Sequence, residues 1–460
     1  MSRGATLTII ATGTAALMIG MDFIGVAAVL TQVEEDLGTD LTGAQWMLNI
    51  YALTFGMGIV VGGKLGDAYG HKRVLMIGLA IFGFTSVGVA GSESAALTIG
   101  FRALQGIGGA LIWPTIVAIT FSAVPPARAA SAVGIVLGAA GFGNVLGPLL
   151  GGTFAELASW RLLFVVNIPA ALIAGALVWR EVPSGGDVGG RRGLDLPGVV
   201  TLALALFALL FSLNIGPESG WSSPEVIALW FGSAVLLVAF VVLEPRSHDP
   251  LIPPRLLRDR GFLAALLANG LVAVVWFSAF IYIPQYAQKA LGYSPLAAAA
   301  VLLPGMVAFA VLSPLSGRFY ERLGERALIA IGMAGMTLAA LNLVIVEESW
   351  GFWGLLPGVL FLGTGAALAI SSAGTAAVAA VDEAHAGSAG GLSFMFHLVV
   401  GATGVAIATA IFASHADGGA TGAEFVDGLH AAYLFGVAVA VAGILNALLI
   451  RTSDERMKSG

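Results

Sequence analysis

Long apolar stretches are the feature that most constrains the fold of this chain. Fourteen stretches reach about 20 mostly apolar residues, the length that an α-helix needs to cross a membrane. Hydrophobic residues make up 58% of the 460 residues and charged residues only 10%, whereas about 25% of a typical soluble domain is charged. The sequence therefore predicts an all-α membrane protein with fourteen transmembrane helices. The expected spans lie near residues 7–30, 44–63, 74–91, 96–120, 131–153, 162–180, 194–213, 223–243, 262–283, 296–316, 327–346, 352–376, 389–413 and 430–450.

Lys and Arg residues are divided unequally between the two sides of these spans. Eighteen of the 21 lie on one side, Arg161 and Lys289 lie on the other, and Arg102 lies inside a span. Cytoplasmic loops of membrane proteins carry the excess of Lys and Arg. We therefore expect both termini to be cytoplasmic and the chain to be a multi-pass protein of a bacterial-type inner membrane.

A charged segment occurs twice in the chain, 254 residues apart. Residues 63–73 read GKLGDAYGHKR, and residues 317–326 read GRFYERLGER. Gly70 corresponds to Gly324, and Asp67 to Glu321. Each copy follows the second span of a set of six, so we expect a duplicated transporter with a short charged loop at the same place in each half.

The repeat predicts how the spans are divided into domains. We expect a six-helix half over residues 1–181, two inserted helices with cytoplasmic linkers over 182–260, and a second six-helix half over 261–460. An even insertion leaves the two halves facing the same way, as parallel repeats require.

Several function classes lack support in the sequence. The net charge of −6 argues against nucleic acid as a partner, and the absence of cysteine excludes thiol chemistry and Cys-based metal sites. The sequence shows no nucleotide-binding loop or metal-ligand cluster, so we expect neither an enzyme nor an ATP-driven pump, and no cofactor or metal.

Two charged residues lie within the predicted spans, Asp22 in the first and Arg102 in the fourth. A charge in the hydrocarbon region costs at least about 2.5–3.5 kcal/mol and marks a functional candidate. Both residues lie about 9–12 Å from the outer ends of their spans, so they can meet if the two helices are neighbours. One reading is a proton-coupling carboxylate whose proton affinity is set by burial and by the Arg. The other is a structural ion pair that ties the two helices together.

Further polar and aromatic residues within the spans are candidates for a substrate cavity, and each also has a packing interpretation. His397 fits a proton-relay or substrate role and equally a hydrogen-bonded packing role. Polar side chains either line a substrate path or join helices, and aromatic ones either form a wall for a lipophilic cation or pack. The candidates are Asn49, Tyr51, Gln105, Trp113, Asn144, Asn269, Trp276, Phe280 and His397.

The charged segment at 63–73 resembles the signature of the major facilitator superfamily between helices 2 and 3. In that superfamily its Asp and basic residues form a charge network that locks the cytoplasmic side. The resemblance implies this role for Asp67 and Arg73, with Lys64 and Lys72 in support. The gating-loop candidates are Gly63, Lys64, Asp67, Gly70, Lys72, Arg73, Arg318, Glu321 and Arg322.

Two further motifs resemble the fourteen-helix drug:proton antiporter family of that superfamily. Residues 102–106 read RALQG, which resembles the family's Arg-x-x-Gln-Gly motif, assigned to proton coupling. The fifth span has the glycine spacing of the antiporter motif. These glycines would form a smooth helix face for close packing. The motif residues are Gly134, Gly143, Gly147, Pro148, Gly151 and Gly152.

The resemblance and the intramembrane charges predict an antiporter that exports an amphipathic organic compound, such as a drug, dye or secondary metabolite, as protons enter. Its partners would be that small substrate, protons and membrane lipids. Rival interpretations are an exporter or flippase of lipids or cell-envelope precursors, a proton-coupled symporter of a polar nutrient, and a membrane receptor or scaffold without transport.

Overall fold

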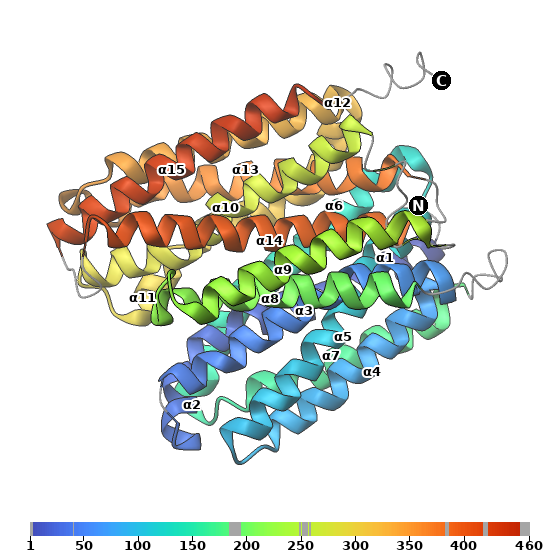
Figure 1. Cartoon of the computed structure of the whole chain (residues 1–460), viewed down its shortest axis with the longest axis horizontal. Coiled ribbons are helices and arrows are strands. Elements are labelled where there is room, and N and C mark those ends of the chain that lie inside the picture. Colours follow the sequence, from blue (N-terminus) through green and yellow to red (C-terminus); the bar gives the residue numbers. More distant parts are fainter. Residues whose placement is uncertain are drawn as a thin grey trace. The chain divides into compact units, whose positions relative to one another are not determined.

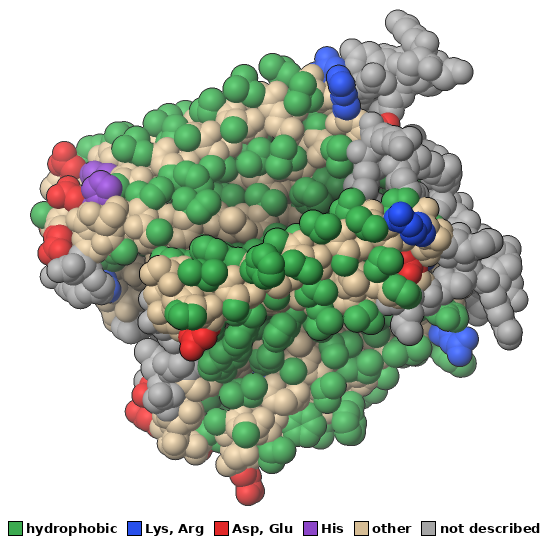
Figure 2. All heavy atoms as spheres, viewed as in Figure 1, with side chains coloured by type: hydrophobic (Ala, Val, Ile, Leu, Met, Phe, Trp, Pro, Cys, Tyr) green, Lys and Arg blue, Asp and Glu red, His purple; other side chains and the backbone are tan. Residues whose placement is uncertain are grey.

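The computed structural model describes residues 3–39, 41–183, 195–247, 250, 256, 259–381, 386–416 and 422–450. Most of the two predicted cytoplasmic linkers, at 182–197 and 244–260, lies outside these residues. Everything described is helical or a short connection, which confirms the predicted all-α class (Figure 1). On the face drawn in Figure 2, hydrophobic side chains cover the helices along their length, and charged side chains lie near helix ends.

The helices that form the predicted spans follow one another in chain order. Up to the second linker they are α1 (Arg3–Gly25), η1 (Val26–Val29), α2 (Leu30–Leu37), α3 (Leu41–Tyr69), α4 (His71–Ala90), α5 (Ala95–Ser122), α6 (Pro126–Leu157), α7 (Leu162–Glu181), α8 (Leu196–Ser219), α9 (Pro224–Leu243) and η2 (Glu244–Arg246). They continue with α10 (Arg260–Lys289), α11 (Pro295–Ala300), α12 (Leu303–Ile345), η4 (Glu348–Trp350), α13 (Gly351–Ala379), α14 (Ala386–Ala413) and α15 (Ala423–Ala447).

Among the described residues, thirteen helices are long and apolar enough to cross a membrane. One of them, α12, has 43 residues and contains two helical segments that are separated at Gly324, where φ is 76° and ψ is 166°. Counting these segments separately gives the fourteen membrane helices that the apolar stretches predict.

The two charged segments are not loops, which corrects the sequence-based expectation. Residues 63–69 form the last two turns of α3, and α4 begins at His71, so only Gly70 separates the helices. Gly70 has φ of 91°, and its counterpart Gly324 has φ of 76°. Positive φ is readily available to glycine, so one residue reverses the chain in each copy. At 29 residues α3 exceeds the roughly 20 needed to span the membrane, and its extra turns carry the charges.

Contacts between Cα atoms divide the chain into two units. The first contains residues 1–257 and 381–395, and the second contains 258–380 and 396–460, so the first ten residues of α14 belong with the first unit. Within the first unit, α3 packs on α5, α4 on α7, and α1 on α5 and α7. Within the second, α12 packs on α13 and α15, and α10 on α13 and α15. The same pairings therefore recur in the two units, as expected for an internal repeat.

The inserted helices α8 and α9 pack against each other, and α8 packs on α3 of the first unit. The Asn49 amide nitrogen donates to the Asn214 amide oxygen over 3.2 Å, and the rings of Trp46 and Phe211 lie 5.7 Å apart. Asn49, a cavity candidate, therefore joins a helix of the first half to the insertion.

Helices α1 and α6 approach each other through glycines. A Cβ atom on Gly143 would lie 2.2 Å from the Leu17 carbonyl oxygen, and one on Gly147 would lie 2.3 Å from the Met21 carbonyl oxygen. In the other direction, a Cβ on Gly20 would lie 2.2 Å from the Ala140 carbonyl oxygen. Gly143 and Gly147 of the antiporter motif, together with Gly20 of α1, let the two backbones touch, which is the close packing that small residues permit between membrane helices.

We expect Gly143→Ala to destabilise the protein, because the added methyl group would collide with backbone atoms of α1 that cannot rotate away. Overpacking of this kind costs about 1–3 kcal/mol, so thermal unfolding in detergent is expected at a lower temperature. Gly100→Ala in α5 is the matched control, since a Cβ there meets no atom within 4 Å. Equal melting temperatures for the two variants would contradict the close α1–α6 packing.

Candidate functional site

An ion pair lies buried between α1 and α5. The Arg102 Nη1 atom is 2.5 Å from the Asp22 Oδ2 atom, and both side chains are 0% exposed. The sequence analysis expected Asp22 and Arg102 to meet if the first and fourth spans were neighbours. In the structure the two side chains do meet.

Both carboxylate oxygens of Asp22 accept hydrogen bonds. The Asn167 amide of α7 donates to Oδ1 over 2.8 Å, and the Gln105 amide donates to the same oxygen over 3.4 Å. Gln105 also accepts a hydrogen bond from Arg102 over 2.8 Å and donates to the Ser86 hydroxyl of α4 over 2.8 Å. Buried polar groups need such hydrogen-bond partners in place of water.

Arg102 is held from several sides. Its Nε atom donates to the Met47 carbonyl oxygen of α3 over 3.0 Å, and its guanidinium lies 4.3 Å from the ring centre of Tyr51 and 5.5 Å from that of Phe164. Aromatic faces attract cations most strongly where water is excluded. The Nη2 atom has no hydrogen-bond partner among the described residues, so the site retains one unused donor.

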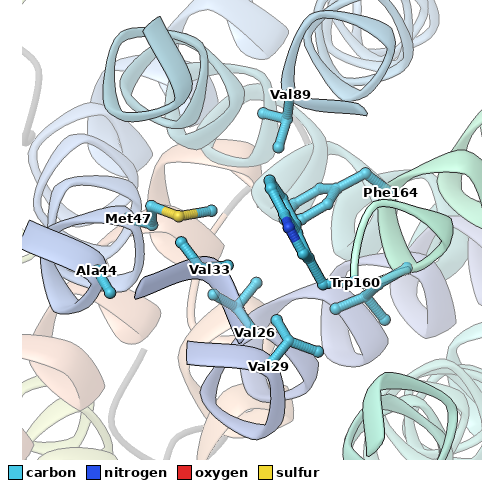
Figure 3. Close-up of a cluster of buried hydrophobic side chains, with 9 residues drawn as sticks. Val26, Val29, Val33, Ala44, Met47, Val89, Trp160 and Phe164 are labelled. Carbon is cyan, nitrogen blue, oxygen red and sulfur yellow. The ribbon is translucent and has the colours of Figure 1, made fainter. Parts of the chain in front are cut away.

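A cluster of buried hydrophobic side chains, drawn in Figure 3, adjoins this ion pair: the ring centre of its member Phe164 lies 5.5 Å from the Arg102 guanidinium. It contains Val26 and Val29 of η1, Val33 of α2, and the side chains of Trp160 and Phe164. Met47 belongs to the cluster and also provides the carbonyl oxygen that binds Arg102. The cluster therefore covers the ion pair with apolar side chains on one side.

The first span is not one continuous α-helix, a feature that the sequence analysis missed. The 3₁₀ segment η1 begins four residues after Asp22, and Val29 has φ of −113° and ψ of 1°. A 3₁₀ stretch within a helix often marks a hinge. No proline marks this break, and the apolar residues Val26–Val29 fit a continuous helix equally well.

Asp67 of the charged segment contacts the beginning of α14. Its Oδ2 atom accepts a hydrogen bond from the Ser388 backbone nitrogen over 2.9 Å and another from the Ser388 hydroxyl. The His71 Nε2 atom lies 3.4 Å from Oδ1. Arg73 is exposed, and no ion pair joins it to Asp67 in the described part of the chain. The structure therefore pairs Asp67 with Ser388, which the sequence analysis did not single out.

Three basic residues of the two charged segments donate hydrogen bonds to backbone carbonyl oxygens. Lys72 donates to the carbonyl oxygens of Trp179 and Val182 over 2.8 and 2.6 Å, and Arg326 donates to that of Ile450 over 2.8 Å. Each cation thus lies at the C-terminal end of the last helix of its half, where the helix dipole is negative. Lys64 donates to the Pro250 carbonyl oxygen over 2.8 Å.

The second charged segment otherwise differs from the first. Arg318, Glu321 and Arg322 are exposed. Glu325 is only 1% exposed, although the sequence analysis assigned it no role. Its position corresponds to His71 in the first copy, and a carboxylate at the start of a helical segment is favoured by the helix dipole.

The cavity candidates fall into separate groups in the two units. In the first unit, Trp113 lies 4.5 Å from Phe394 between ring centres, and Tyr51 stacks at 5.8 Å on Phe55. Asn144 lies beside Gly20 at the α1–α6 contact.

In the second unit, the His397 Nδ1 atom lies 3.0 Å from the backbone oxygen and 3.2 Å from the amide oxygen of Asn269. Trp276 contacts Phe280 and Phe309, with ring centres 5.0 and 5.2 Å apart. These contacts fit the packing interpretation of His397 with Asn269 and of Trp276 with Phe280. A substrate role for these residues stays a prediction.

Asn167 is the site residue that sequence reasoning missed. It is the single asparagine in the apolar stretch 162–180, and it is 0% exposed. An isolated amide inside a membrane span indicates a contact with another helix, because membrane helices use such groups for hydrogen bonds between helices.

The sequence profile of the Major Facilitator Superfamily matches residues 10–405. The multidrug resistance protein Stp of Mycobacterium tuberculosis is 30% identical over 415 residues, which cover 90% of this chain and 77% of that protein. The puromycin resistance protein pur8 of Streptomyces alboniger is 32% identical over 446 residues, which cover 94% of this chain and 87% of that protein.

Solved structures share the fold at low sequence identity. The proton:xylose symporter XylE aligns with a TM-score of 0.68 at 15% identity, over 98% of this chain and 96% of that chain. The human organic anion transporter MFSD10 aligns with a TM-score of 0.67 at 14% identity, over 98% of this chain and all of that one.

A double-mutant cycle tests the coupling within the buried pair. Asp22→Ala and Arg102→Ala should each destabilise the protein by about 3–5 kcal/mol, because each leaves a buried charge without its partner. The double variant removes both charges, so its loss should be smaller than the sum of the single losses. Unfolding in detergent measures all three. Additive losses would contradict a direct interaction.

Proposed function

Because this chain belongs to the major facilitator superfamily, we propose that it exports amphipathic organic compounds across the bacterial cell membrane in exchange for protons. The observation that carries the proposal is the buried Asp22–Arg102 pair with its shell of amides. Relatives that cover most of the chain are named for resistance to several drugs and to puromycin, and one in Amycolatopsis lactamdurans for cephamycin export. These names support an exported organic substrate.

Asp22 is the proposed proton carrier. When ionised it holds Arg102 at 2.5 Å and accepts the amide hydrogen bonds. A proton that binds the carboxylate removes its charge, so Arg102 is left as an uncompensated buried cation, which costs several kcal/mol. That cost favours a rearrangement in which Arg102 finds another partner or the site becomes hydrated. Protonation of the Asp22 carboxylate would thereby favour a conformation in which the pair is separated.

The contacts of the pair explain how such a preference would reach the rest of the first unit. Asp22 lies on α1, and its partners lie on α5 and α7. Gln105 extends the network to Ser86 on α4, and Arg102 reaches the Met47 carbonyl oxygen on α3. Five helices therefore share one hydrogen-bonded network, and a change at Asp22 alters contacts on each of them.

In the proposed cycle, protons from outside neutralise Asp22 and favour release of the substrate, and loss of the proton to the cytoplasm restores the pair. Alternating access would come from rocking of the two repeats about a site near the midplane of the bilayer. The proton gradient alone would drive the cycle, with no cofactor. Both termini would lie in the cytoplasm, as the distribution of Lys and Arg predicts.

The aromatic groups in each unit suit an amphipathic substrate. Trp113 with Phe394 and Trp276 with Phe280 and Phe309 present large apolar surfaces that also attract organic cations. We propose that the rings of the first unit, Trp113 and Phe394, contact the apolar part of the substrate, while Asp22 responds to its arrival through the hydrogen-bonded network of the same unit.

The proposal predicts the behaviour of Asp22→Asn in proteoliposomes with an imposed pH gradient. Addition of puromycin or a lipophilic cation should dissipate the gradient through the wild-type protein. The asparagine variant keeps the size of the side chain but cannot carry a proton, so substrate-dependent dissipation should fall to the level of empty liposomes. Asp22→Glu should retain part of it. Full proton-coupled exchange by Asp22→Asn would rule out the assignment.

Asp36→Asn is the matched control. Asp36 lies on α2, where hydrogen bonds from Trp160 and Arg161 hold the pKa of its carboxyl below the ordinary value of 3.8. The carboxyl therefore stays ionised at every pH of the assay, and whatever stability it contributes is lost only as the pH falls through its lowered pKa. Since it cannot carry protons near neutral pH, exchange by Asp36→Asn should equal that of the wild type.

A further inference from the structure

A groove of about 950 Å³ runs between α4 and α7 on the surface of the first unit. These helices pack side by side (Figure 1). Small residues on both walls keep the groove open: Ala80 and Gly83 on α4, and Ala171, Gly175 and Ala176 on α7. Larger apolar side chains line its edges, among them Phe84 at 70% and Leu172 at 68% exposure.

The length of the groove matches one leaflet of a membrane. Its lining on α4 runs from Met76 to Val87, which corresponds to about 16 Å of helix. The hydrocarbon core of a bilayer is about 30 Å thick, so the groove spans roughly half of it. A single extended acyl chain fits this depth.

One end of the groove is basic and the other is apolar. Arg180 lines the basic end, and its side chain is 83% exposed. Arg73, in the first turn of α4, is also exposed. Trp179 at the same end is 72% exposed, and tryptophan concentrates at the level of lipid headgroups. The opposite end, near Val87 and Ile168, carries no charge in the groove lining.

The charges at the basic end do not cancel. The Arg180 Nε atom lies 3.4 Å from a Glu181 oxygen, and the Arg180 side chain is 83% exposed. Lys72 binds the carbonyl oxygens of Trp179 and Val182 and lies 5.8 Å from the Trp179 ring centre. Its ammonium thus offsets the negative end of the α7 dipole. Among the described residues, this end therefore holds the cations of Arg180, Arg73 and Lys72 and the carboxylate of Glu181.

We propose that the α4–α7 groove binds one molecule of an anionic phospholipid, with an acyl chain along the groove and its phosphate beside Arg180 and Arg73. The cationic end of the groove favours an anionic headgroup. Because the groove spans about one leaflet, the bound lipid belongs to the leaflet whose headgroups lie at that cationic end. The proposal concerns the outer surface of the first unit and does not depend on the transported substrate or on proton coupling.

The test uses nanodiscs that contain the full-length protein and a phospholipid with a photoreactive group in its acyl chain. Labelled phosphatidylglycerol should crosslink to peptides covering residues 76–87 and 168–180 several-fold more than labelled phosphatidylcholine. Unlabelled phosphatidylglycerol should compete. Equal labelling by the two lipids, or labelling spread evenly over all membrane helices, would overturn the proposal.

Variants separate the headgroup from the acyl chain. Arg180→Gln and Arg73→Gln should each lower capture of phosphatidylglycerol by about fivefold, the effect of one basic residue near an anionic membrane surface, without changing capture of phosphatidylcholine. Arg128→Gln is the matched charge control, since Arg128 is exposed and lies outside the groove. An unchanged lipid preference in the Arg180 and Arg73 variants would overturn the proposal.

Ala176→Trp should fill the groove and lower capture of both lipids there. Ile173→Trp on the same helix is the size control, because Ile173 is 54% exposed and does not line the groove. Ala80→Trp on the opposite wall repeats the test if Ala176→Trp fails to fold, as judged by size-exclusion chromatography. Undiminished labelling in a folded groove-filling variant would overturn the proposal.

Discussion

The ion pair between Asp22 and Arg102 is the interaction on which the rest of this structure depends. Moving either charge alone into a membrane interior costs several kcal/mol, and only a close partner and a full set of hydrogen bonds offset that cost. The pair obtains them from five helices of the first unit. The helices are consequently constrained by the chemistry of one carboxylate, and any event that removes its charge alters the contacts of all of them.

Packing isolates this pair and fixes its position. Gly143 and Gly147 bring the backbone of α6 into contact with α1 on either side of Met21, next to the carboxylate. The hydrophobic cluster that contains Trp160 and Phe164 (Figure 3) adjoins the pair through the Phe164 ring and through Met47. Because water is excluded, the attraction between the charges is stronger than at a surface. The 3₁₀ segment η1 follows α1 directly, and two of its residues, Val26 and Val29, belong to this cluster.

Much of the fold and the centre of the site could be predicted from the sequence, because membrane helices and buried charges leave strong signals. The apolar stretches predicted the spans, and Asp22 and Arg102 stood out as charges inside them. Features set by local backbone geometry or by distant contacts were missed: the helical form of residues 63–69, the break at η1, and the contact of Asp67 with Ser388, 321 residues away. Asn167 was missed because burying an uncharged amide in a membrane costs less free energy than burying a charge, so an asparagine within a span is a weaker indication of a functional site. Which cavity candidates meet a substrate stays a prediction, since their described contacts lie within separate units.

Proton release upon substrate binding tests the central claim most directly. Purified protein in weakly buffered detergent solution would be mixed with puromycin or a lipophilic cation, and a pH indicator would record the protons released. If Asp22 exchanges its proton for substrate, the wild-type protein should release protons at a pH where Asp22 is protonated before binding, and Asp22→Asn should bind without release. Equal release by the folded Asp22→Asn protein, or binding to the wild type without release at any pH, would contradict the account.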